Sequence, residues 1–305
     1  MESSLIGETA AVATSCLWTI GSIFFTSAGR KIGSLSLNAY RSLIAVGFLL
    51  AAHLFFLESF LPHATYAQWF WMGLSGVVGL GIGDSGLFAA YVLMGPRRSV
   101  LVMALSPIFA TVGAYLMLGE ILPSLALIGI AITLGGIMLV LLEGEKHSGE
   151  LPLSRKLKTY GVFFAFIGAV GQGVGLVLAK VGIYSNSAMT LNPLSATLMR
   201  MILGAFSVFM VMLVGGRVYE LRRALSNRKG MGLTVVAAFT GPFLGVTFSM
   251  IAVTYAQAGV AQTLMSLSPV MIIPLVWFLY NQRTSWRGII GALIAVLGVS
   301  ILFLV

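Results

Sequence analysis

Three ionisable residues lie well inside long apolar runs of this sequence and are the first candidates for chemistry. Asp84 lies deep in one run, and Arg41 and Arg200 lie about seven to nine residues inside two others. An acid or a guanidinium among apolar residues is costly and by default indicates function. Asp84 could bind an amine, carry a proton, or pair with a basic residue or backbone amide. Each arginine could attract a carboxylate or extend its charge to an interface.

A proline motif occurs twice inside apolar runs. Met103-Ala-Leu-Ser-Pro107 recurs in the second half of the chain as Met265-Ser-Leu-Ser-Pro269. A proline inside a helix lacks an amide hydrogen and displaces the carbonyl four residues earlier. Freed carbonyls at membrane depth line a cavity or bond to Ser and Thr. We therefore predict a hinge or cavity wall at Pro107 and Pro269, with a simple packing kink as the alternative. Ser106 and Ser268 are expected to bond the freed carbonyls.

Polar and aromatic side chains recur at helical spacing in several of the same runs. Such stripes should face a protein interior, because hydroxyls facing acyl chains would lack partners. Ordinary contacts between helices are the alternative for each residue alone. Together they predict an aromatic, methionine-rich cavity for an organic solute, lined by Trp18, Ser22, Tyr40, Arg41, Asp84, Phe88, Tyr91, Met103, Ser106, Gln172, Thr247, Met250, Gln262, Met265 and Ser268.

The composition indicates that lipid is the solvent of these runs. Of 305 residues, 58% are hydrophobic and 9% charged, with a mean hydropathy of +1.00, whereas soluble domains are about 25% charged. The runs lack the alternation of a barrel strand and are long enough for helices, which need roughly 20 apolar residues to cross a bilayer. We predict ten spans: 8–28, 34–57, 67–94, 99–118, 123–142, 159–184, 191–214, 231–255, 260–280 and 286–305.

Basic residues alternate between the connections of these spans. Fifteen of the 18 Lys and Arg residues fall in odd-numbered loops, and the even-numbered loops and termini have none. The positive-inside rule then places the odd-numbered loops in the cytoplasm and both termini outside. The net charge of +9 is thereby explained without a nucleic-acid partner.

The chain divides into two related halves. The shift in numbering that takes Pro107 to Pro269 also takes Gly129 to Gly291 and Gly136 to Gly298, and nearly the same shift takes Arg41 to Arg200. We predict one five-helix repeat over 1–142, a cytoplasmic linker over 143–158 and a second repeat over 159–305. Because each half has five spans, the second enters the membrane inverted, which places Arg41 and Arg200 toward opposite faces. Inverted repeats around a midplane site are typical of secondary transporters; a scaffold, an anchor or a membrane enzyme is the alternative.

Other sites are not expected. Gly81, Gly83 and Gly86 match the dinucleotide fingerprint, but they lie in an apolar span rather than after a strand,. The histidines are scattered, so we predict no catalytic residue, metal or cofactor. Small residues in spans 5 and 10 predict a peripheral scaffold or a homodimer face, leaving a monomer and a homodimer open.

Several of these features together resemble the drug/metabolite transporter superfamily in its ten-helix EamA-type form. They are the Trp18 span, Arg41, the segment GDSGLFAAYVLMGPRRS over 83–99, the LSP…GE run ending at Glu120, and their second-half echoes. The resemblance covers essentially the whole chain. It implies export of small metabolites, often amino acids or toxic organic cations, from a bacterial inner membrane, with YddG-type amino-acid exporters as the suggested group.

Two departures from that family matter. Gly119-Glu120 becomes Asn281-Gln282 in the second half, so a symmetric role for the acid is in doubt. Family members also often keep both termini in the cytoplasm, whereas the loop charges here predict the opposite. We predict an all-α carrier that exports neutral aliphatic or aromatic amino acids by alternating access, with Asp84 or Arg41 meeting a charged end. The alternative is a proton-coupled extruder of organic cations that uses Asp84.

Overall fold

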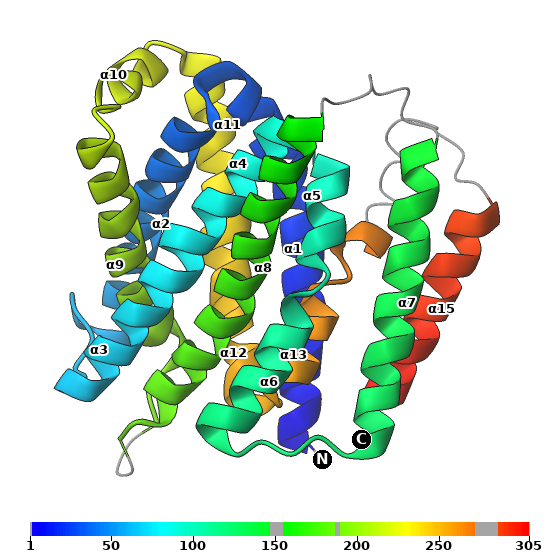
Figure 1. The fold of residues 1–305 in the computed structure, drawn as a ribbon. Coiled ribbons are helices and arrows are strands. Elements are labelled where there is room, and N and C mark those ends of the chain that lie inside the picture. The colour runs from blue at the N-terminus through cyan, green and yellow to red at the C-terminus, as the bar shows by residue number, and fades with distance from the viewer. Residues whose placement is uncertain (1, 95, 147–154, 187–189, 272–285, 305) are drawn as a thin grey trace.

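The described part of the chain is a bundle of helices. The computed structural model describes all residues except 1, 95, 147–154, 187–189, 272–285 and 305, and no strand occurs among those it describes (Figure 1). The first half contains α1 (Glu2–Ile32), α2 (Ser34–Leu57), α3 (Tyr66–Ser75), η1 (Gly76–Gly83), α4 (Asp84–Met94), α5 (Pro96–Met103), α6 (Ser106–Leu118) and α7 (Ser124–Lys146). The second contains α8 (Arg155–Tyr184), α9 (Pro193–Val214), α10 (Tyr219–Leu225), α11 (Arg228–Ala238), η2 (Phe239–Gly245), α12 (Val246–Tyr255), α13 (Ala258–Met265) and α15 (Trp286–Leu302).

The length and apolarity of these helices make this an integral membrane protein. Within the described residues, seven helical runs are long and apolar enough to cross a bilayer, and they are 4–32, 34–57, 66–90, 124–141, 159–184, 193–214 and 228–255. The apolar helices α6 and α15 are shorter. Part of the predicted span 260–280 lies outside the described residues. An all-α protein with several membrane spans is therefore confirmed.

Two spans contain a wide helical turn that periodicity did not predict. The span 66–94 passes from α3 through the π-helical segment η1 into α4, and the span 228–255 passes through η2 in the same way. Both segments are glycine-rich, and η2 also contains Pro242, which cannot donate a backbone hydrogen bond,. The shift that relates the two prolines also takes Gly79 and Gly83 in η1 to Gly241 and Gly245 in η2. Such π turns inside helices often mark functional positions.

The two Ser-Pro motifs begin new helices rather than bending continuous ones. After α5 ends at Met103, a turn covers Ala104 and Leu105, and α6 then begins at Ser106. In the same way α13 ends at Met265, and helical backbone resumes at Ser268. Pro107 therefore stands in the first turn of α6, where the missing amide hydrogen has no helical partner to lose. The helix is interrupted just before each proline, and a hinge or cavity wall at these points stays a prediction.

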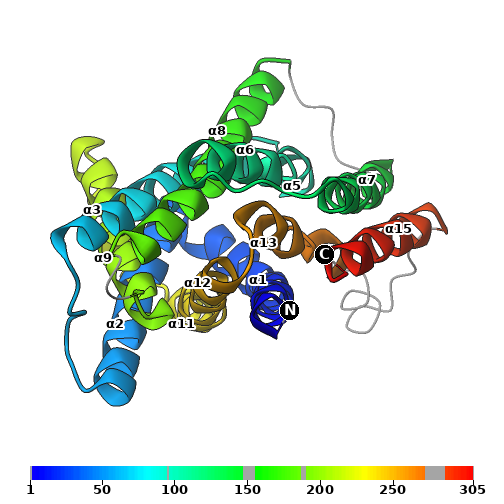
Figure 2. The ribbon, with the colours of Figure 1, turned by 90° about the horizontal axis from the view of Figure 1, so that it is seen from below.

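Packing in one half has a counterpart in the other. Helix α1 packs on the run α11–η2–α12 and on α13, and α8 packs on the run α3–η1–α4 and on α5 and α6. The pairs α2 with α9 and α7 with α15 each join a helix to its repeat mate, and α6 packs on α13, which is the counterpart of α5. Figure 2 shows α7 and α15 side by side at one edge of the bundle, away from α2 and α9.

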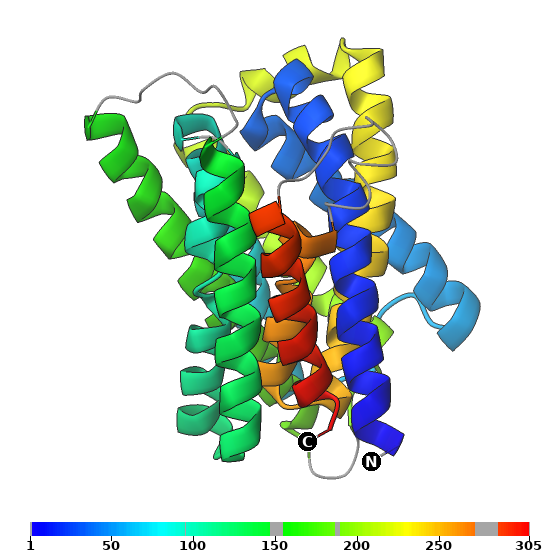
Figure 3. The ribbon, with the colours of Figure 1, turned by 90° about the vertical axis from the view of Figure 1, so that its right-hand side faces the viewer.

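Small residues bring α7 and α15 into backbone contact. A Cβ added at Gly136 would lie 2.3 Å from the backbone nitrogen of Ala295, and one at Gly298 would lie 2.5 Å from that of Thr133. The two helices lie alongside each other in Figure 3 as well. The small residues of spans 5 and 10 thus face each other within one chain, while Leu293 and Leu297 point outward, 64% and 59% exposed.

The ends of the bundle differ in charge. The two termini lie at the same end, and α10 lies at the other (Figure 1). Arg30 and Lys31 end α1, and the carbonyl of Lys31 accepts a hydrogen bond from Nδ2 of Asn227, just before α11, at 3.3 Å. The basic connections at Arg30–Lys31 and at α10–α11 therefore share the end opposite the termini.

Candidate functional site

Arg41 and Asp84 form an ion pair in the interior. Nη2 of Arg41 donates to Oδ2 of Asp84, and the two residues are 7% and 6% exposed. Two of the predicted site residues, far apart in the sequence, are therefore brought together. Both side chains are buried within the protein, which speaks against the alternative that Arg41 extends its charge to an interface.

The surroundings of Arg41 satisfy its guanidinium on several sides. Nε donates to Oδ1 of Asn38, one helical turn earlier on α2, at 2.9 Å. The rings of Phe25 and Phe88 lie 5.3 and 4.9 Å from the guanidinium carbon, within the range of a cation–π interaction. Arg41 is thus held by a carboxylate, an amide and two aromatic faces.

Asp84 is held from the other side by α8. Nε2 of Gln172 donates to Oδ1 of Asp84 at 2.6 Å, so both carboxylate oxygens accept a hydrogen bond. This reach depends on glycines, because a Cβ at Gly171 would lie 2.6 Å from the Cα of Gly83, and one at Gly175 would lie 2.8 Å from the Cα of Gly79. The glycine-rich η1 therefore lets α8 approach closely enough for Gln172 to reach the acid.

Arg200 approaches the same span from α9. It is 3% exposed, and the carbonyl of Gly79, the residue it lies against, accepts a hydrogen bond from the backbone N–H of Asp84. A Cβ at Gly79 would lie 2.6 Å from its Nη2, so the guanidinium lies over η1. For Arg200 the sequence favoured a structural role at an interface over carboxylate binding, and the structure instead buries its side chain against η1.

The two interrupted spans meet through side chains of the predicted lining. Nε2 of Gln262 on α13 donates to Oγ of Ser106 on α6 at 2.9 Å. Oγ of Ser268 donates to the carbonyl of Ser15 on α1 at 3.2 Å, and Oγ1 of Thr19 donates to the carbonyl of Ser268 at 3.3 Å. Ser268 therefore donates to another helix and not to the carbonyl of Met265, whereas for Ser106 the bond from Gln262 leaves donation to the carbonyl of Met103 a prediction. Pro107 and Pro269 are both buried at this meeting point.

A second group of lining residues surrounds η2. A Cβ at Gly245 would lie 2.6 Å from Cδ1 and Nε1 of Trp18, so the indole rests on this glycine. Met250 and Met265 are 0% and 1% exposed and belong to one core cluster. Oγ1 of Thr247 bonds to the carbonyl of Phe243 in its own helix at 2.6 Å, and Oγ of Ser22 bonds to the carbonyl of Thr19 at 2.7 Å.

Three residues of the predicted lining are not shown beside Asp84, at the interrupted spans or around η2. The hydroxyl of Tyr40 donates to the carbonyl of Leu221 in α10 at 3.0 Å, which puts it at the basic end of the bundle. Met103 is half-buried against Gly168 of α8. Tyr91 lies in α4, and its side chain is outside the described ones.

At the end that carries the termini, a second, largely buried ion pair joins the halves. Nζ of Lys180 on α8 lies 2.6 Å from Oε1 of Glu120, just after α6, and also donates to the carbonyl of Ala256. Oε2 of Glu120 accepts from the amide of Ala258 at 2.9 Å, at the start of α13. The pair therefore closes the turn between α12 and α13 against α6 and α8. Asn281 and Gln282, the second-half counterparts of Gly119 and Glu120, lie outside the described residues.

Replacing Glu120 with Gln is expected to lower the free energy of unfolding by about 1.5–3 kcal/mol, the usual contribution of a hydrogen bond to a charged group. Lys180 would keep the Ala256 carbonyl but lose its counter-ion. Circular dichroism during thermal unfolding in detergent measures the change. The double variant Glu120→Gln/Lys180→Gln should cost less than the sum of the single variants, and strict additivity would contradict the pairing.

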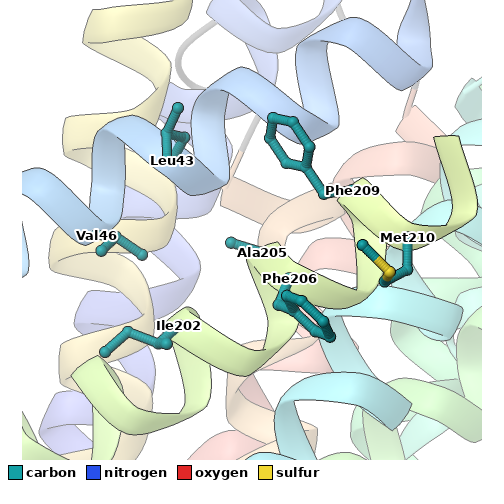
Figure 4. A pocket seen from close by; sticks show the side chains of 7 residues that line it. All are labelled: Leu43, Val46, Ile202, Ala205, Phe206, Phe209 and Met210. Atoms are coloured by element: carbon teal, nitrogen blue, oxygen red, sulfur yellow. The ribbon is translucent and has the colours of Figure 1, made fainter. Parts of the chain in front are cut away.

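An apolar hollow lies on the outer surface, away from the predicted lining. It has a volume of about 340 Å³ and is lined from α2 and α9 by Leu43, Val46, Ile202, Ala205, Phe206, Phe209 and Met210 (Figure 4). None of these residues is in the predicted lining. Leu43 and Phe206 are 49% and 59% exposed, so this hollow faces the surroundings of the bundle.

The sequence did not indicate that Asn38 bonds to Arg41, or that Lys180 pairs with Glu120. Asn38 could have been found, because it lies three residues before Arg41 and shares a helix face with it. Lys180 and Glu120 lie in different halves of the chain, and no local spacing joins them.

Gly81, Gly83 and Gly86 are helical, whereas a dinucleotide-binding fingerprint would place them in a loop after a strand. In the described part of the chain, no group of three or more His, Cys, Asp or Glu side chains could hold a metal ion.

Comparisons with known proteins cover both halves of the chain. A family model described as the EamA-like transporter family matches residues 5–142 and 159–304. No curated protein matches. Among 29 solved chains that match, one crystal structure, described only as that of a protein, aligns over 100% of this chain and 96% of its own with a TM-score of 0.74 at 20% identity. At that identity the likeness shows the fold alone.

Proposed function

This chain belongs to the EamA-like transporter family, and from that membership we propose that it is a secondary carrier that exports small amphipathic metabolites. Neutral aliphatic and aromatic amino acids are the proposed solutes. The family model matches the chain as two separate repeats, which supports two five-helix repeats over 1–142 and 159–305 joined by the linker 143–158.

The observation that carries the proposal is the matched irregularity of the two halves. In the residues that the structure describes, each half has one π-helical segment and one interruption before a proline, at positions related by the same shift in numbering. Each of these irregular spans packs against a helix of the other half. We infer ten spans in two inverted halves, because such halves can exchange conformations and open a midplane site to either side in turn.

The interrupted spans provide a point in each half at which the helix can bend. At the interruptions, Ser106, Gln262 and Ser268 make hydrogen bonds between helices. Hydrogen bonds of this kind are weaker than tight packing and can exchange between two arrangements. We propose that Pro107 and Pro269 are the hinges, and that the predicted lining residues around them and around Asp84 form the solute path.

Asp84 is engaged in a way that favours the metabolite carrier over the cation extruder. Both carboxylate oxygens accept hydrogen bonds, from Arg41 and Gln172. Neither oxygen is therefore open to bind the amine of an organic cation unless the bond from Arg41 or Gln172 is broken. The ion pair of Lys180 with Glu120 would close the end that carries the termini, opposite the basic connections. By the positive-inside rule, that end faces away from the cytoplasm of an inner membrane.

We propose a monomer as the working unit, since the small residues of α7 and α15 already face each other within the chain. A homodimer through the outer faces of these helices is the alternative. Neither transport nor the solute path needs a cofactor or metal.

The direct test of the proposed function is exchange of labelled amino acids in proteoliposomes. Purified protein is reconstituted with unlabelled leucine inside, and uptake of labelled leucine, phenylalanine, glutamate and lysine outside is followed. We expect leucine and phenylalanine to exchange at least about tenfold faster than in protein-free vesicles. Rates equal to those of empty vesicles for every solute would contradict the proposal.

A further inference from the structure

The buried cluster beside η1 carries a net charge of +1. It contains the guanidinium groups of Arg41 and Arg200 and the carboxylate of Asp84, and these residues are 7%, 3% and 6% exposed. Arginine stays protonated in proteins, so both guanidinium groups are charged. One carboxylate cannot neutralise both.

The surplus charge belongs to Arg200. The two oxygens of Asp84 already accept from Arg41 and Gln172, and the two aromatic rings lie over Arg41. Nε of Arg200 is buried and has no hydrogen-bond partner among the described residues. A buried donor without an acceptor is costly, and a ligand that accepts from it would remove that cost.

The repeat explains why Arg200 lacks a carboxylate of its own. Arg200 is the repeat mate of Arg41, but the shift that takes Pro107 to Pro269 takes Asp84 to Val246. Val246 is buried in an apolar cluster with Leu198 and Met201. The second half therefore keeps the guanidinium and has lost the acid.

We propose that Arg200 binds the carboxylate group of the transported solute. The planar guanidinium presents paired donors that match the two oxygens of a carboxylate. The carrier would accordingly select zwitterionic or anionic carboxylates and reject organic cations that lack this group. This inference rests on the proposed carrier function and names the group that the carrier recognises.

Gly79 is a positioning residue in this proposal. A Cβ there would lie 2.6 Å from Nη2 of Arg200, with the next contacts, to Gly171 and Gly175, at 3.6 Å. An added methyl group therefore meets the end of a flexible side chain and otherwise fits. Gly79→Ala should displace the guanidinium while preserving its charge and the packing of α8.

The experiment compares matched solutes on the same protein. Leucine and phenylalanine are compared with leucinamide and phenylalaninamide, which replace the carboxylate with an amide. Thermal stability in detergent reports binding, and exchange in proteoliposomes reports transport. We expect the amino acids to stabilise the protein and to exchange, and the amides to do so at least about tenfold more weakly.

The variants assign the effect to Arg200. Arg200→Gln should remove the preference for the carboxylate, and Arg200→Lys should retain part of it because the charge remains without the paired donors. Gly79→Ala should weaken amino-acid binding about tenfold. Arg228→Gln, which changes an exposed arginine at the start of α11, is the matched control and should leave both assays unchanged.

Three outcomes would overturn the assignment. Equal exchange of amino acids and amides would overturn it while leaving the carrier function intact. Stabilisation by chloride that persists without any solute, measured against methanesulfonate and lost in Arg200→Gln, would assign the site to an inorganic anion if amino acids do not compete. Exchange of no solute would remove the carrier function and this inference together.

Discussion

Asp84→Asn is expected to destabilise this protein more than any other single charge removal. The variant keeps the shape of the side chain but leaves the guanidinium groups of Arg41 and Arg200 buried without a carboxylate. Removing one partner of a buried ion pair costs roughly 3–5 kcal/mol. Thermal and denaturant unfolding in detergent should show this loss, and exchange of amino acids should fall to the level of empty vesicles.

The control for this prediction is Glu220→Gln. Glu220 pairs with Arg217 at 2.7 Å, but the side chain of Arg217 is 50% exposed, and such surface pairs contribute roughly 0–1 kcal/mol. A stable Asp84→Asn protein that loses only proton coupling would instead support the organic-cation extruder. A loss of unfolding free energy that is much larger in Asp84→Asn than in Glu220→Gln therefore identifies Asp84 as a structural counter-ion. Equally small losses of unfolding free energy would identify it as a proton carrier.

Gly136→Ala is expected to separate α7 from α15. The added methyl group would lie 2.3 Å from the backbone nitrogen of Ala295 and 2.6 Å from the carbonyl oxygen of Gly291. Backbone atoms cannot move aside as a side chain can, so the two helices must shift. Overpacking of this kind costs roughly 1–3 kcal/mol, and the melting temperature in detergent should fall accordingly.

The neighbouring glycine provides a control of opposite sign. A Cβ at Gly135 meets nothing within 4 Å, so Gly135→Ala should be neutral or stabilise the helix by roughly 0.5–1 kcal/mol. Equal melting temperatures for the two variants would contradict the backbone contact between α7 and α15.

Seven of the ten predicted spans are long apolar helices in the described residues, and these could be predicted from the sequence because lipid requires such helices. The sidedness that the loop charges indicate stays a prediction. The π-helical segments could not be predicted, since the period of apolar residues does not register one extra residue in a turn. Gly79, Gly83, Gly241 and Gly245 were visible as glycines, but a glycine in a membrane span equally permits close packing. The Pro107 and Pro269 motifs located the interruptions to within three residues, because proline has a local steric effect.

The sequence predicted individual residues of the candidate site better than the contacts between them. Arg41, Asp84 and Gln172 were each candidates, but their contact joins α2, α4 and α8 and depends on how these helices rotate about their axes. Arg200 was weighed as a surface residue because its place in the span left it within reach of an interface. Its burial follows from Gly76 and Gly79, which let α9 approach η1, and this tertiary contact has no signature in local spacing.

The central claim is that the two halves exchange conformations and open the solute path to one side of the membrane and then to the other. A reversible cross-link at the end that carries the termini tests this claim most directly. Glu120 and Lys180 are replaced by Cys in a Cys16→Ser background, which removes the single native cysteine, and a bis-methanethiosulfonate reagent joins them. We predict that joined protein in proteoliposomes exchanges no leucine and that a reducing agent restores exchange. Undiminished exchange by fully cross-linked protein would contradict the account.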